Sequence, residues 1–209
     1  MIIGKIEYLN LLPFNLFLRM SGIKHISIYS YPSKINSIFY QKKVDSAFIS
    51  SIKSKNQRCL DVGIVAHKKV LSVLNCKGEK RDDTQSETSN ALAYLLGENG
   101  ETIIGDKALK VYYKKKRDCN DLATLWYKKF DLPFVFARFC INKDDEKYKK
   151  LMKKFLNKKI KIPQYILKRE AKQLGISTKN VQEYLDLIYY KMGYKEKKSL
   201  KLFLKLSAN

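Results

Sequence analysis

Short polar side chains occur where apolar segments of the chain are expected to form strands and to end. Asn10 closes the first such segment, Ser50 and Ser51 close a later one, and Ser72 lies within the run 70–75. Ligands of open α/β sheets bind beyond the carboxyl ends of the strands, so we expect these groups to meet at one cleft. Amide and hydroxyl groups recognise a ligand through directed hydrogen bonds.

The stretch Ser-Glu-Thr-Ser at residues 86–89 is typical of a helix start, because its hydroxyl groups can cap free amides before an apolar run. Such a start presents backbone N–H groups and a positive dipole end, which favour a bound carboxylate. Taken alone, each polar residue is better explained as a cap or turn residue, and Asp106 could equally cap a loop or contact a hydroxyl group. Together they form a candidate substrate-binding set: Ser50, Ser51, Ser86, Thr88, Ser89, Gly105 and Asp106.

Several well-known reaction motifs are missing from the sequence. No G-x-G-x-x-G or G-x-x-x-x-G-K-[ST] pattern occurs, so no nucleotide cofactor is indicated. His25 and His67 are expected at the surface, and they suggest no catalytic triad. Any reaction would then run on hydrogen bonds, dipoles and at most one carboxylate. The four cysteines show no C-x-x-C spacing, so we expect no metal site and free thiols in a reducing compartment.

The chain is strongly basic, with a formal net charge of +22, but only six of its 42 basic residues are arginines. The lysines are spread along the chain, which favours a solvated surface with some steering of anions over a nucleic-acid site. No run of about 18 apolar residues suggests a membrane span. Lys5 and Glu7 interrupt the N-terminal segment, which reads as a strand rather than a signal peptide, and we expect a cytoplasmic protein.

Strand-like and helix-like segments alternate in the first half, which predicts an α/β fold with a mostly parallel sheet. Helices are expected over 10–20, 33–43, 86–96 and 121–130, and strands over 1–9, 25–31, 46–49, 60–66, 70–75, 102–104 and 134–141. Everything after Asp144 reads as helical. These patterns predict two lobes, one from residues 1–74 and 142–209 and a small one from residues 75–141.

The stretch EAKQLGISTKNVQEYL at 170–185 has the spacing of a helix-turn-helix, with Ala171, Gly175 and Val181 at its structural positions. A DNA-binding regulator is therefore one hypothesis. However, Glu183 and Asp186 would lie on the outer face of the second helix, where they would face phosphates poorly. We expect this pair to cover the sheet of the first lobe and to bind no nucleic acid.

The segments IGKIEYLNLLP (3–13), VLSVL (70–74), SETS (86–89), IIGDKAL (103–109) and DLATLWYKKFDLPFVFA (121–137) resemble the chorismate dehydratases of the futalosine route to menaquinone. A weaker likeness extends over 183–203. The resemblance implies the fold of type 2 periplasmic binding proteins, in which two α/β lobes are joined by two crossing strands. The sequence departs from the family at Glu87, where arginine is usual, and in the short segment between Leu96 and Thr102.

The resemblance also implies a reaction, in which chorismate loses water to give 3-[(1-carboxyvinyl)oxy]benzoate without a metal or redox cofactor. Asn10 and Ser72 match the positions expected to be catalytic, and they would orient the substrate for elimination. The enolpyruvyl carboxylate of the substrate itself is our hypothesis for the base. The main alternative is a binding protein for small carboxylates that lacks catalysis. The expected partner is the small-molecule substrate, with no membrane partner, and the protein is expected to be a monomer or a homodimer.

Overall fold

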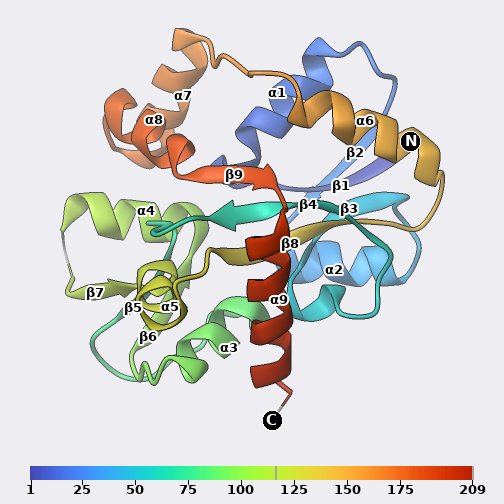
Figure 1. Ribbon diagram of the computed structural model, residues 1–209. Coiled ribbons are helices and arrows are strands. Elements are labelled where there is room, and N and C mark those ends of the chain that lie inside the picture. Colours follow the sequence, from blue (N-terminus) through green and yellow to red (C-terminus); the bar gives the residue numbers. More distant parts are fainter. Residues whose placement is uncertain (116, 209) are drawn as a thin grey trace.

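The computed structural model describes residues 1–115 and 117–208, so residues 116 and 209 of the two predicted lobes lie outside the described part. Figure 1 shows two β-sheets with helices packed around them. The larger sheet has the order β2-β1-β3-β8-β4-β9. Its strands are β1 (Ile2–Ile6), β2 (Ile26–Ser30), β3 (Ser46–Ser50), β4 (Cys59–Ala66), β8 (Phe134–Ile141) and β9 (Ile188–Lys191).

The smaller sheet has the order β6-β5-β7, with β5 antiparallel to both neighbours. Its strands are β5 (Val73–Cys76), β6 (Glu101–Ile104) and β7 (Cys119–Asp121). The helices are α1 (Leu12–Met20), α2 (Pro32–Tyr40), α3 (Glu87–Leu95), α4 (Gly105–Lys114), α5 (Leu122–Phe130), α6 (Asp145–Leu156), α7 (Gln164–Leu174), α8 (Thr178–Asp186) and α9 (Tyr194–Leu206). Among the described helices, none combines the length and the apolar character needed to cross a bilayer.

The start of α1 is held by an aromatic cluster. Phe14 packs edge-on against Phe48 of β3 and Phe155 of α6, with ring centroids 5.4 and 5.2 Å apart. Burial of such rings contributes both apolar area and edge-to-face attraction. The short 3₁₀ turn η1 (Leu9–Leu11) directly precedes α1, so the same packing fixes the position of Asn10.

Strands β4 and β8 connect the two sheets. Strand β4 leaves the larger sheet toward β5, and β8 returns from the smaller unit and pairs antiparallel with both β3 and β4. The predicted α/β fold with two crossing strands is therefore confirmed. The prediction of a mostly parallel sheet is wrong: β1 pairs parallel with β2 and β3, whereas β8 and β9 run antiparallel to their neighbours.

Three elements were not predicted from the sequence. Helix α4 begins directly at Gly105, where the prediction ended a strand, and β7 has only the residues Cys119–Asp121. Strand β9 contradicts the prediction that everything after Asp144 is helical. Its first residue, Ile188, continues the apolar period of α8, so the periodicity did not reveal the change to extended backbone.

The division of the chain into two lobes stays a prediction, although the sheet order differs from it at one strand. Residues 134–141 were assigned to the small lobe, yet β8 lies inside the larger sheet. Conversely, α9 packs on α5, where the indole of Trp126 donates a hydrogen bond to Ser199 at 2.9 Å and lies edge-on to Phe203. The C-terminal helix thus contacts both halves of the chain.

The predicted helix pair is confirmed, with a turn at Gly175–Ser177. Gly175 has a φ of 65°, which glycine adopts without strain, and Ser177 caps α8 by accepting from the amide of Asn180 at 3.0 Å. The pair does not simply cover the larger sheet. Helix α8 contacts its edge strand β9, whereas α7 contacts α4 beside the smaller sheet.

The prediction of free thiols is wrong, because all four cysteines form disulfides. Cys59 of β4 pairs with Cys140 of β8, and Cys76 of β5 pairs with Cys119 of β7. Each pair occupies directly opposed positions of neighbouring antiparallel strands. The partners are 81 and 43 residues apart in the chain, so only strand pairing brings them together. Disulfides are rarer in reducing compartments, and the cytoplasmic location stays a prediction.

Candidate active site

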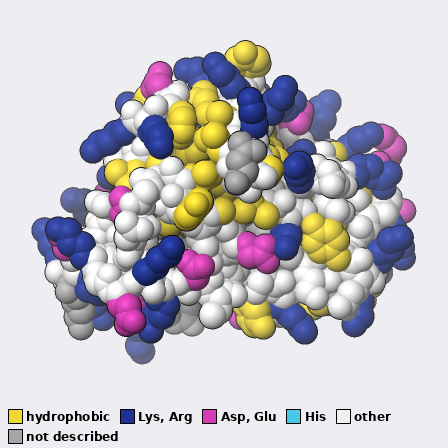
Figure 2. Space-filling model, turned by 90° about the horizontal axis from the view of Figure 1, so that it is seen from below, with side chains coloured by type: hydrophobic (Ala, Val, Ile, Leu, Met, Phe, Trp, Pro, Cys, Tyr) yellow, Lys and Arg dark blue, Asp and Glu magenta, His cyan; other side chains and the backbone are white. Residues whose placement is uncertain are grey.

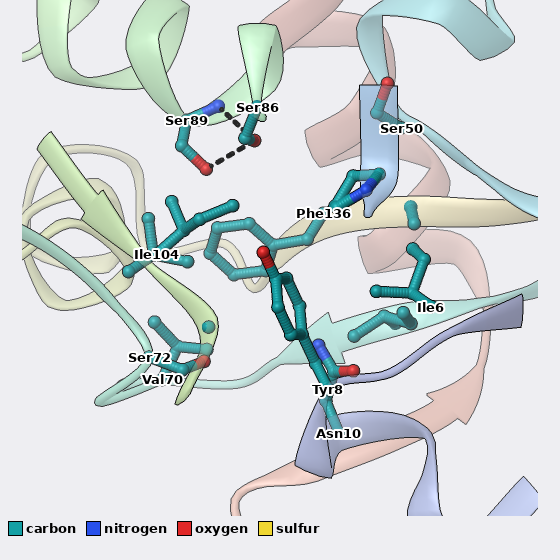
Figure 3. Close-up of a pocket in the computed structure, with 15 residues that line it drawn as sticks. Ile6, Tyr8, Asn10, Ser50, Val70, Ser72, Ser86, Ser89, Ile104 and Phe136 are labelled. Atoms are coloured by element: carbon teal, nitrogen blue, oxygen red, sulfur yellow. Dashed lines mark hydrogen bonds between the residues drawn. The ribbon is translucent and has the colours of Figure 1, made fainter. Parts of the chain in front are cut away.

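A cleft lies where the two sheets and the starts of α3 and α4 meet (Figure 3). Apolar side chains from both sheets form most of its wall. The lining residues are Ile6, Tyr8, Asn10, Pro32, Ser50, Ile64, Val70, Ser72, Val73, Ser86, Ser89, Ile104, Gly105, Phe136 and Ala137.

The structure brings most of the candidate residues to this cleft. Asn10, Ser50, Ser72, Ser86, Ser89 and Gly105 line it. In Figure 3, the serines at the start of α3 lie on the side of the cleft opposite Asn10 and Ser72. Polar residues from several predicted strands and helix starts therefore share one space. The roles of these residues in binding or catalysis remain predictions.

The other three candidates lie behind the lining, where they join neighbouring elements. Ser51 donates a hydrogen bond to the carbonyl of Val135 at 2.5 Å. Thr88 accepts from the amide of Ile52 at 3.2 Å, and Asp106 accepts from the amide of Leu9 at 3.2 Å. Burial raises the pKa of the Asp106 carboxyl. These contacts tie the starts of α3 and α4 to the segments that follow β3 and β1.

Asn10 offers an unused polar group. Its backbone carbonyl accepts a hydrogen bond from the hydroxyl of Tyr190 at 2.5 Å, which fixes the main chain. Its side-chain Oδ1 is buried and has no hydrogen-bond partner among the described residues. Buried polar atoms are nearly always paired in folded proteins. This amide oxygen is therefore available to accept a hydrogen bond from a molecule bound in the cleft.

Ser72 is held through both its backbone and its side chain. The Asp121 carboxylate accepts from the amides of Val70 and Leu71 at 2.9 and 2.6 Å, and it also caps α5. Leu71 has a φ of 59°, which costs a non-glycine residue conformational energy and persists only where the surroundings impose it. The Ser72 hydroxyl accepts from the phenol of Tyr184 at 3.0 Å.

The start of α3 forms the opposite wall. Ser86 is its N-cap and accepts from the amide of Ser89 at 3.2 Å, and the two hydroxyl oxygens are 2.8 Å apart. The positive end of the helix dipole therefore points at the cleft. Ser50 stands on β3, where its hydroxyl accepts from the Asn36 amide at 2.7 Å.

Tyr8 and Gly105 are in close contact at one side of the cleft. Gly105 has a φ of +61°, and a Cβ atom there would lie 2.7 Å from the Tyr8 ring. The Tyr8 hydroxyl donates to the side-chain carbonyl of Gln85, which precedes α3. Burial raises the pKa of this phenol, so it remains a neutral donor. Tyr8 therefore bridges the end of β1 to the segment that leads into α3.

The cleft has no ionised side chain among its lining residues, although the chain as a whole is strongly basic. His25 and His67 also lie outside the lining. In the described part of the chain, no group of three or more histidine, cysteine or acidic side chains could hold a metal ion. An anion in this cleft would be held by backbone amides, hydroxyl groups and helix dipoles.

Glu87, the departure from the family pattern, forms an ion pair. Its carboxylate lies 2.8 Å from the ammonium group of Lys53, which belongs to the turn after β3. Glu87 also occupies the first turn of α3, where a negative charge favours the helix dipole. This ion pair joins the start of α3 to the turn after β3 at the surface, and Glu87 does not line the cleft.

Solved structures define the class of fold. A protein of Archaeoglobus fulgidus superposes with a TM-score of 0.77 at 12% identity, covering 99% of this chain and 96% of that one. A Candida albicans gene product with the generic periplasmic binding protein fold gives a TM-score of 0.58 at 12% identity, covering 99% and 89% of the two chains. The chain therefore has a periplasmic-binding-protein-like fold.

Sequence comparisons define the family within that class. Residues 87–209 match the menaquinone biosynthesis family model. A chorismate dehydratase of Campylobacter jejuni is 46% identical, over 98% of this chain and 96% of the relative. A chorismate dehydratase of Thermus thermophilus is 24% identical, over 97% and 93% of the two chains. The chain belongs to the menaquinone biosynthesis family, which confirms the resemblance read from the sequence.

Four residues that shape the cleft were missed by the sequence analysis. Tyr8 is part of the wall, Asp121 and Tyr184 hold Ser72, and Tyr190 holds Asn10. Tyr8 had a usable signal, since it stands two residues before Asn10 at the same strand end. The other three come from distant parts of the chain, and no local pattern connects them to the cleft.

Proposed function

We propose that this protein is a chorismate dehydratase, a carbon–oxygen lyase that removes water from chorismate to give 3-[(1-carboxyvinyl)oxy]benzoate. The observation that carries the proposal is the shared cleft, where the unpaired amide oxygen of Asn10 and the hydroxyl of Ser72 face an apolar space closed by the start of α3. The 46% identity to a chorismate dehydratase over nearly the whole chain supports it.

The cleft suits a dicarboxylate with a carbon ring. The amides and hydroxyl groups at the start of α3 would bind one carboxylate, because helix starts stabilise anions without a basic side chain. The ring would lie against Ile6, Ile104 and Phe136 of the apolar wall. Asn10 and Ser72, on the opposite side, would then contact the oxygen atoms around the reacting carbons.

The reaction is a 1,2-elimination that balances within the substrate. The ring carbon that carries the enolpyruvyl ether loses its proton, and the freed electron pair forms the new ring double bond. The C–O bond to the neighbouring hydroxyl breaks, and the hydroxyl takes up that proton to leave as water. The product ring is aromatic, which supplies the driving force.

The enolpyruvyl carboxylate of the substrate is the base in this proposal. The lining of the cleft contains no carboxylate and no histidine, so the protein residues seen there offer no ordinary base at neutral pH. The carboxylate is tethered to the reacting carbon through the ether oxygen. Well-oriented intramolecular groups reach effective molarities of about 10⁵ M or more, so orientation by Asn10 and Ser72 can supply much of the catalysis.

Turnover of chorismate by the purified protein tests the proposal. Loss of the absorbance of the cyclohexadiene and appearance of the enolpyruvyl benzoate by mass spectrometry are the expected results. Unchanged chorismate that nevertheless binds tightly would instead support a carboxylate-binding protein on the same fold. Absence of both turnover and binding would remove both proposals.

Removal of the two candidate catalytic groups tests the site. Asn10→Ala and Ser72→Ala should each lower kcat about 10²-fold, the effect of losing one oriented polar group, while thermal unfolding changes little. Asn15→Ala is the matched control, because Asn15 also has a buried, unpaired Oδ1 but does not line the cleft. Normal turnover in both cleft variants would show that the site is misassigned.

A further inference from the structure

Tyr184 contacts the candidate catalytic serine from outside the cleft. Its side chain is fully buried, with 1% of its surface exposed, and it is not among the lining residues. The phenol donates to the Ser72 Oγ at 3.0 Å, across 112 residues of sequence. Tyr184 therefore touches the residue that faces the ligand without being placed to touch the ligand itself.

This hydrogen bond limits the direction of the serine proton. A serine hydroxyl has one O–H donor and two acceptor lone pairs. When the phenol of Tyr184 occupies a lone pair on the buried side, the Ser72 O–H is left to point elsewhere. The Ser72 side chain lines the cleft, so its proton is free to donate to a bound molecule there. Burial raises the pKa of Tyr184, which keeps the phenol protonated as the donor.

Helix α8 holds Tyr184 in place by contacts on its other faces. The hydroxyl of Tyr113 on α4 donates to the backbone carbonyl of Asn180 at 3.0 Å. Val181, one turn before Tyr184, is completely buried. Asp121 meanwhile fixes the two amides that precede Ser72. The backbone of Ser72 is thus fixed from one side and its hydroxyl from another.

We propose that Tyr184 is a positioning residue that aims the Ser72 hydroxyl at an oxygen of the substrate. The inference rests on the proposed function, since it assigns to Ser72 a donor role in the same reaction. It also explains what the helix pair at 164–186 does: its second helix supplies the phenol behind the cleft. A group of this kind adds to catalysis by removing wrong orientations of the donor rather than by making a new contact.

The test begins with Tyr184→Phe, which keeps the ring and removes the hydroxyl. Loss of one oriented hydrogen bond should lower kcat about tenfold and leave KM within about twofold, because ground-state binding by the start of α3 is untouched. In the Ser72→Ala background, the same substitution should have no further effect on kcat. That non-additivity distinguishes positioning of Ser72 from a general loss of packing.

Tyr113→Phe is the matched control, because it removes a phenol that anchors the same helix but does not reach Ser72. It should leave kcat near the wild-type value. An equal loss in both variants, or additive losses of Tyr184→Phe and Ser72→Ala, would overturn the inference.

If Tyr184→Phe does not fold, 3-fluorotyrosine at position 184 keeps the shape and changes the acidity of the phenol. It should then shift kcat in the wild-type background and not in Ser72→Ala, and an unchanged kcat in both would overturn the inference.

Wild-type turnover, measured first, separates the two proposals. If the wild-type protein does not convert chorismate, the proposed function fails and the role of Tyr184 fails with it. If the wild type converts chorismate and Tyr184→Phe matches it in kcat, only the role of Tyr184 fails.

Discussion

The cleft between the sheets and the groove beside α9 differ in the charge of the side chains that line them. The groove is lined by basic side chains and by Asp61, with Met192, Leu200 and Leu204 between them; the basic ones are Lys55, Arg138, Lys197, Lys201 and Lys205. The cleft has no ionised side chain in its lining. Figure 2 shows lysine and arginine side chains scattered around the face on which α9 ends.

The density of basic side chains therefore does not mark the position of the candidate site in this chain. Lysine side chains are flexible and strongly hydrated, so they attract anions without fixing their orientation. The cleft instead has fixed dipoles and hydroxyl groups within apolar walls, which need little reorganisation when charge moves in a reaction. A surface of net charge +22 can raise the local concentration of an anionic substrate, while the neutral cleft sets its geometry.

Among the variants that test the difference between the cleft and the groove, Gly105→Ala is expected to have the largest effect on activity. The added Cβ would lie 2.7 Å from the Tyr8 ring and force that wall of the cleft to move. We expect kcat/KM to fall about 10²-fold, as for other small displacements of reacting groups. Steady-state kinetics and thermal unfolding should be measured together.

Gly97→Ala is the control for the backbone strain in Gly105→Ala. Gly97 also has a positive φ, +77°, but nothing lies within 4 Å of its added Cβ. Both variants should lose about 1–2 kcal/mol of stability through the left-handed conformation, and only Gly105→Ala should lose activity. Equal activity in the two variants would show that the Tyr8 wall is not part of a working site.

Ser86→Ala should have an intermediate effect on activity. The substitution changes the start of α3, which in the proposed function binds a carboxylate in place of a basic side chain. KM for chorismate should rise about tenfold, and stability should fall by about 1 kcal/mol through loss of the N-cap. Ser177→Ala removes the equivalent cap of α8, a helix with no residue in the lining, and should not raise KM while showing the same loss of stability. A rise in KM with both serines would point to loss of helix stability as the cause.

Neutralising the groove should have the smallest effect. Lys201→Gln together with Lys205→Gln removes two charges from the groove and none from the cleft. Turnover of chorismate at moderate salt should stay within about twofold of wild type, because screened surface charges act weakly over more than about 10 Å. A large fall in kcat/KM would mean that the basic groove, and not the neutral cleft, governs the reaction.

Part of the site could be predicted because strand ends and helix starts are local features. Asn10 stands where an apolar segment ends, Ser72 is the polar residue within the apolar run 70–75, and Ser86 precedes an apolar helical period. Period and capping are short-range properties of the chain. Their positions therefore followed from a few residues each, and the structure brings all three to one cleft.

The supporting contacts could not be predicted, since they join residues that are distant in sequence. The phenol of Tyr190 reaches the carbonyl of Asn10 across 180 residues. In the sequence, Glu87 is an isolated departure from the family, and only the tertiary structure shows that it pairs with Lys53 of the turn after β3. The cysteine pairs were missed for the same reason, because each depends on the register of two strands.

The sequence by itself determined the α/β alternation, the candidate polar groups and the resemblance to the menaquinone biosynthesis family. Those are properties of short segments, whose period and turn chemistry act over a few residues. Only the tertiary structure decided that the helix pair at 164–186 lies behind the cleft, with Tyr184 on Ser72. That arrangement depends on packing between elements that are far apart in the chain. Burial and strand pairing together select this packing, and no local sequence pattern contains it.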